Sequence, residues 1–188
     1  MWDGFLTALA IALESVTWWY APTVILLWSW HRWNPSSQVN VIRVLFATNT
    51  LLLIHSVVWS ITFLIAWIWP IANALADGRE ASAYLPHNGA QFVLTSFISF
   101  LIGLVPVVFL RRPVRTRFVV SFVIIVIGWI WKLILDVIER GHIRFMPGIN
   151  VETMVLYLFV FSGLLYLTFR IVRKGYDGYL THTKQPAP

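Results

Sequence analysis

Long apolar segments are the feature of this sequence that most limits what the chain can fold into. A helix needs roughly 20 apolar residues to cross a bilayer core of about 30 Å, because lipid cannot pair exposed backbone groups. Five stretches meet this requirement: Phe5–Trp28, Ile42–Trp69, Ala90–Leu110, Phe118–Ile138 and Thr153–Val172. They predict an all-α, polytopic membrane bundle with about five transmembrane helices in one domain (residues 1–174). Residues 175–188 are predicted to form a cytoplasmic tail.

The composition supports a membrane protein. Of the 188 residues, 59% are hydrophobic and 12% are charged, against roughly 45–50% and about 25% in soluble domains. The chain has no cysteine, which excludes disulfides, iron–sulfur ligation and thiolate chemistry by its own residues. We find no nucleotide-binding, nucleophile or metal-ligand motif, so the chain is expected to bind no metal and to be non-catalytic alone. Pro22 and Pro106 fall within spans, where each is expected to kink its helix.

The basic residues predict an orientation. Cytoplasmic loops of membrane proteins are enriched in Lys and Arg, so we interpret the net charge of +6 as a topology signal rather than a nucleic-acid surface. One side of the predicted bundle carries most of the cations: Arg32, Arg43, Arg111, Arg112, Arg115, Arg117, Arg170, Arg173, Lys174 and Lys184. The other side carries Arg79, Arg140 and Arg144. The N-terminus is therefore expected outside and the C-terminus inside, in a bacterial-type inner membrane.

The Arg111–Arg117 turn is expected to anchor the protein at the cytoplasmic surface. Its four arginines, Arg111, Arg112, Arg115 and Arg117, also suit contact with anionic lipid or an acidic partner.

Four ionisable side chains lie inside the predicted spans, where charge is costly and usually functional. Glu14 is in the first span, His55 in the second, and Lys132 and Asp136 in the fourth. At 1.5 Å of rise per residue, Glu14 lies about 4 Å and Lys132 about 6 Å outward of the midplane, with His55 near the midplane. Lys132 and Asp136 are one turn apart and are able to pair along one helix face.

Three interpretations of these groups remain open. The first is a structural hydrogen-bond or ion-pair network that joins helices. The second is a site for quinone or proton transfer, because Lys and His donate hydrogen bonds to carbonyls while Asp and Glu relay protons. The third is a b-type cytochrome with His55 as an axial ligand, which is disfavoured because haem in a bundle usually takes histidines from facing helices.

Three segments of the second half carry a family resemblance. Residues 103–112 are GLVPVVFLRR, residues 128–140 are GWIWKLILDVIER, and residues 147–166 are PGINVETMVLYLFVFSGLLY. In this order, residues 90–172 resemble the C-terminal part of the NrfD/polysulfide-reductase membrane-subunit family. The resemblance implies that Lys132 takes the place of the family's basic residue and Glu152 that of the acidic residue opening the next helix.

The resemblance also implies a function and partners. Family members exchange electrons or protons with quinone, usually carry no redox cofactor themselves, and associate with an iron–sulfur subunit and often a molybdopterin or multihaem subunit. Because they have eight or more spans, this chain would be a half-length relative completed by another membrane subunit. We therefore expect an integral membrane subunit of an electron-transfer complex, partnered by iron–sulfur or cytochrome subunits and lipids. The alternative is a non-catalytic accessory subunit that scaffolds such a complex.

Overall fold

The computed structural model describes residues 2–76, 89–140 and 150–183, with only the backbone described for some residues near helix ends. The described residues form helices and short connections, with no strand among them. The expected cations Arg79, Arg144 and Lys184 lie outside these residues.

Within these ranges, four helices are long and apolar enough to cross a membrane. They are α1 (Trp2–Trp33), α2 (Gln38–Ala76), α4 (Phe118–Arg140) and α5 (Val151–Thr183). A short 3-10 helix, η1 (Pro35–Ser37), joins α1 to α2. The predicted all-α architecture is confirmed for the described residues, and four of the five predicted spans correspond to helices of membrane-crossing length. α5 continues to Thr183, so the first residues of the predicted tail extend the last helix.

The third predicted span, 90–110, differs from the other four because it is broken. α3 (Gly89–Gly103) ends seven residues early, and the 3-10 helix η3 (Val105–Leu110) follows it. A second 3-10 helix, η4 (Arg112–Thr116), then leads into α4. Pro106 has no backbone N–H and lies in the first turn of η3, where that missing donor costs nothing. Pro22, in contrast, lies inside α1 without ending it.

The tighter winding of η3 leaves a carbonyl for another helix. Val107 N–H donates to Leu104 O at 2.9 Å, three residues back, instead of to Gly103 O. The Ser56 hydroxyl of α2 donates to Gly103 O. The carbonyl that the break leaves without a helical partner is thus hydrogen-bonded by α2.

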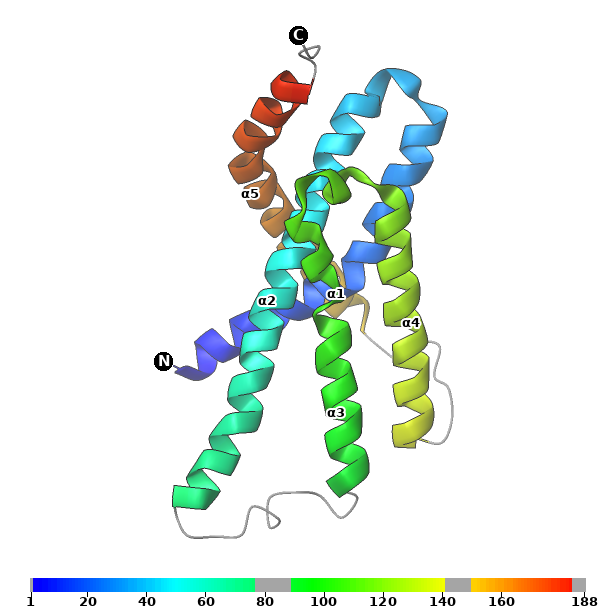
Figure 1. Ribbon diagram of the computed structural model, residues 1–188. Helices are drawn as coiled ribbons and strands as arrows, with labels where there is room; N and C mark the ends of the chain where they lie inside the picture. The colour runs from blue at the N-terminus through cyan, green and yellow to red at the C-terminus, as the bar shows by residue number, and fades with distance from the viewer. Residues whose placement is uncertain (1, 77–88, 141–149, 184–188) are drawn as a thin grey trace.

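The helix ends sort into two groups (Figure 1). The α1–α2 connection, η3 with η4, and the C-terminal half of α5 lie toward the upper end of the view. The C-terminal end of α2, the N-terminal end of α3 and the C-terminal end of α4 lie toward the lower end. The segments that carry the arginines of the predicted cytoplasmic side therefore meet at one end of the molecule.

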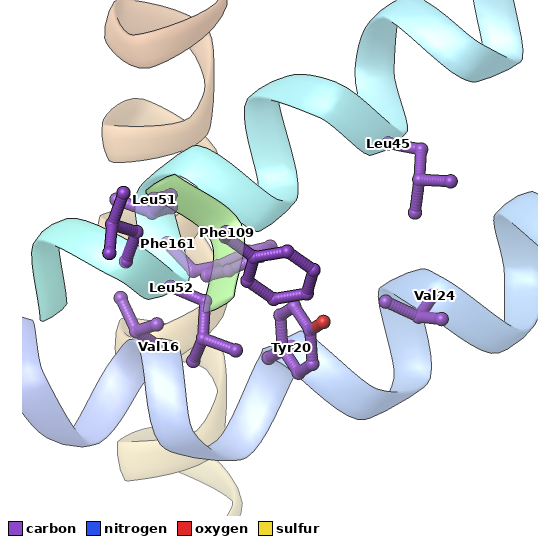
Figure 2. Close-up of a cluster of buried hydrophobic side chains, with 9 residues drawn as sticks. Val16, Tyr20, Val24, Leu45, Leu51, Leu52, Phe109 and Phe161 are labelled. Atoms are coloured by element: carbon purple, nitrogen blue, oxygen red, sulfur yellow. The ribbon is translucent and has the colours of Figure 1, made fainter. Parts of the chain in front are cut away.

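The hydrophobic core lies where α1, α2, α5 and η3 meet. Its buried members are Val16, Tyr20, Val24, Leu45, Leu51, Leu52, Leu53, Phe109 and Phe161. Figure 2 shows the Phe109 ring from η3 beside the Tyr20 ring from α1, and Val24 opposite Leu45. In lipid such packing stabilises through van der Waals contact rather than by exclusion of water.

The surface is apolar. Large hydrophobic side chains are exposed on every long helix, for example Leu26 of α1, Ile65 of α2, Val119 of α4 and Phe159 of α5. This is the reverse of a soluble protein, whose exposed apolar patches are small, and it fits a chain surrounded by lipid or by other membrane subunits.

Candidate functional site

Glu14, the predicted acidic residue of the first span, lies on the surface of α1. Its side chain is exposed, and its Oε2 accepts a hydrogen bond from the Tyr157 hydroxyl of α5. Tyr157 itself is buried, at 8% exposure. α1 and α5 are therefore joined at this level by a carboxyl group and a phenol, and Tyr157 is a partner that the sequence did not predict.

His55 is half-buried and faces α1 from α2. Its Nε2 lies 3.3 Å from the Thr17 Oγ1, and the Thr17 hydroxyl donates to the Leu13 carbonyl at 3.1 Å. A hydroxyl has one proton, so when Thr17 donates to Leu13 the Nε2 of His55 must be the donor to Oγ1. A haem iron bound at Nε2 would have to displace this contact.

Lys132 projects from α4 over the face of an α1 tryptophan. Its Nζ lies 4.8 Å from the centroid of the Trp18 ring, within the range of a cation–π interaction. The Lys132 side chain is exposed. Asp136 lies one turn further along α4, but its side chain is outside the described part of the structure, and its pairing with Lys132 stays a prediction.

The contacts of Glu14, His55 and Lys132 lie on adjacent turns of α1. Glu14 and Trp18 are four residues apart and Thr17 lies between them, so α5, α2 and α4 each contact the same stretch of α1. The structure thus brings the three predicted residues near one another, but each has its own partner. Across the described ranges, His, Asp and Glu do not gather in groups of three or more that could hold a metal ion. We call residues 14–18 of α1, with Tyr157, His55 and Lys132, the α1 polar row.

A second polar cluster, centred on Asn49 of α2, was missed by the sequence analysis. The Asn49 side chain is fully buried. Its Oδ1 accepts hydrogen bonds from the Tyr20 hydroxyl at 2.8 Å and the Ser121 hydroxyl at 3.1 Å. Its Nδ2 donates to the Arg115 carbonyl at 2.7 Å. One amide therefore joins α1, α2, η4 and α4, and the clearest signal for it is the polar triplet Thr48–Asn49–Thr50 inside an apolar span.

Arg115 turns into the protein, whereas the other three arginines of its turn are exposed. Its Nε donates to the Phe109 carbonyl, its Nη1 lies 3.3 Å from the Thr50 hydroxyl, and its guanidinium lies 5.2 Å from the centre of the Phe46 ring. Burial, and then the positive charge of Arg112, hold the pKa of Arg115 below its usual value. Arg115 therefore fastens η3 and η4 to α2, while Arg111, Arg112 and Arg117 remain available to the predicted membrane surface.

No protein-family model, curated protein or solved structure matches this chain. The geometry of the α1 polar row and of the Asn49 cluster is therefore the basis for any functional conclusion.

Proposed function

We propose that this chain is an integral membrane subunit of a multi-subunit electron-transfer complex and that the α1 polar row takes part in proton transfer or quinone interaction. The observation that carries the proposal is the exposure of Glu14 and Lys132 within the strongly apolar, membrane-length segments of α1 and α4. We further propose the N-out, C-in orientation predicted from the basic residues.

The exposure of these two side chains argues for a larger assembly. A charged side chain at the centre of a bilayer costs at least about 2.5–3.5 kcal/mol, and facing lipid directly leaves that cost uncompensated. Intramembrane charges usually face a bundle interior, a partner or a polar pathway. A neighbouring subunit, or a ligand held between subunits, supplies that environment for Glu14 and Lys132.

The side chains of the α1 polar row have the chemical groups needed for proton transfer or for binding a quinone. Reduction of a quinone needs hydrogen-bond donors at its carbonyl oxygens and a route for protons. Lys132 is a hydrogen-bond donor, and Glu14 is a proton acceptor to which the Tyr157 hydroxyl already donates its one proton. The resemblance of residues 90–172 to quinone-linked membrane subunits supports the same proposal and assigns the family's basic position to Lys132.

The test compares two tyrosines of α5 in the intact complex. After purification in a mild detergent, co-purifying chains are identified, and quinone-coupled turnover is measured for Tyr157→Phe and Tyr166→Phe. We expect iron–sulfur or cytochrome companions and a loss of at least about tenfold in turnover for Tyr157→Phe, as for a lost proton-transfer group. Tyr166 is exposed near Arg170, so Tyr166→Phe should match the wild type. Full turnover by Tyr157→Phe and by Glu14→Gln would remove the α1 polar row from the reaction.

An accessory, scaffolding role is the second candidate. It is favoured by the separate partners of Glu14, His55 and Lys132, which is the arrangement of contacts that hold helices together. In that case Glu14→Gln and Lys132→Met would release the chain from its companions during purification, while the turnover of complexes that remain assembled would be unchanged. A visible spectrum of the purified complex, compared between wild type and His55→Leu, tests the b-type cytochrome alternative.

A further inference from the structure

Glu14 and Lys132 are exposed opposite charges beside the same turn of α1. Glu14 is exposed on α1. Lys132 is exposed on α4 and sits over Trp18, one turn along α1 from Glu14. The hydrogen bond to Glu14 comes from Tyr157 and the contact of Lys132 is with the Trp18 ring, so among the side chains that the structure describes neither charge meets an opposite one.

The two charges also lie at a similar depth. Four residues of α1 correspond to about 6 Å along the helix axis, and the oblique course of α1 in Figure 1 makes the difference in height smaller than that. Depth matters because two copies of a membrane protein share one orientation, so a twofold axis between them runs along the membrane normal. Such an axis brings residues together only when their depths match.

We propose that a second copy of this chain docks on the α1–α4 flank, with Glu14 of each copy paired to Lys132 of the other. This inference rests on the membrane location in the proposed function and adds a partner to it. A twofold interface is self-complementary, and here each exposed charge finds its opposite on the same surface. Ala10 and Thr17, which are exposed on either side of Glu14 along α1, are small enough to allow close approach of a helix backbone.

Charge reversal in trans tests the pairing. Wild type, Glu14→Lys and Lys132→Glu are each labelled and placed in lipid vesicles, and association is followed by energy transfer as the protein-to-lipid ratio changes. We expect the wild type to dimerise and each single variant alone to associate at least about a hundredfold more weakly, because like charges then face each other twice. An equimolar mixture of Glu14→Lys with Lys132→Glu should regain wild-type association, since every charge again meets its opposite.

The mixture is the decisive sample because a structural defect within either variant cannot be cured by adding the other. Arg170→Glu, which reverses an exposed charge in the C-terminal half of α5, is the control and should associate like the wild type. A monomeric wild type, or a mixture that stays monomeric, would overturn the pairing. A monomer that still co-purifies with companions would leave the proposed function standing, whereas a dimer without companions or turnover would remove the proposed function and keep the dimer.

Discussion

At the scale of single residues, the buried amide of Asn49 is the most consequential side chain. It satisfies two hydroxyls and one backbone carbonyl from three other elements. An unsatisfied buried polar group costs about 1–3 kcal/mol, and lipid cannot supply the missing partner as water would. The Asn49 cluster therefore fixes how α1, α4 and η4 sit around α2.

We expect Asn49→Leu to lower the free energy of unfolding by about 2 kcal/mol or more, because Tyr20, Ser121 and the Arg115 carbonyl each lose a partner. Thermal unfolding in a mild detergent measures the loss. Asn40→Leu is the matched control on the same helix; Asn40 is exposed, and its change should stay within about 0.5 kcal/mol. Equal unfolding temperatures for the two variants would show that the cluster contributes nothing to stability.

The sequence placed Glu14, His55 and Lys132 inside spans but did not give their partners. Residue type and depth can be inferred from one helix at a time, whereas a partner depends on how neighbouring helices are rotated and tilted. Tyr157 is the example: a tyrosine in an apolar span is unremarkable until α5 packs on α1. The role of Asn49 could in principle have been predicted from the sequence, because an amide within an apolar segment needs a buried hydrogen-bond partner.

At the scale of elements, the broken third segment is the main departure from expectation. Hydropathy predicts 90–110 as one helix because it averages over side chains and ignores the backbone donor that Pro106 lacks. Gly103 and Pro106 together were a sequence signal for a break. The packing that accompanies the break could not be predicted: the Trp59 ring of α2 lies directly against Gly103 and stacks on Phe63, which stacks on Phe100 of α3.

We expect Gly103→Ala to destabilise the protein by about 1–3 kcal/mol, because the added methyl group would overlap the Trp59 ring and disturb this aromatic stack. Gly128→Ala and Gly163→Ala are the controls, since nothing lies within 4 Å of the added carbon at either position. Both controls should be neutral or stabilising by up to about 1 kcal/mol through helix propensity. The comparison uses equilibrium unfolding in mixed detergent, and a Gly103→Ala protein as stable as the controls would contradict the close contact.

At the scale of the whole molecule, the arrangement of helix ends agrees with the pattern of basic residues. The segments rich in arginine come to one end although they are far apart in the sequence (Figure 1). Charge bias and the alternation of spans were enough to predict this grouping. The side of the membrane on which that end lies stays a prediction.

The absence of native cysteine makes the orientation directly measurable. Single variants Ser36→Cys, between α1 and α2, and Thr116→Cys, in η4, should react with a membrane-impermeant thiol reagent only from the cytoplasmic side. Asn73→Cys, near the other end of α2, should react only from the opposite side. Labelling is compared between intact cells and inverted vesicles, and reaction of Ser36→Cys in intact cells would reverse the proposed orientation.

The length of α2 has a consequence for the surroundings of the protein. Its 39 residues correspond to about 58 Å, and even a tilt of roughly 40° leaves about 45 Å along the normal, well beyond the hydrocarbon layer. At least one end of α2 must therefore extend past the hydrocarbon layer to the headgroups or beyond. A soluble protein that binds this end of α2 would be held at a fixed height relative to the lipid headgroups.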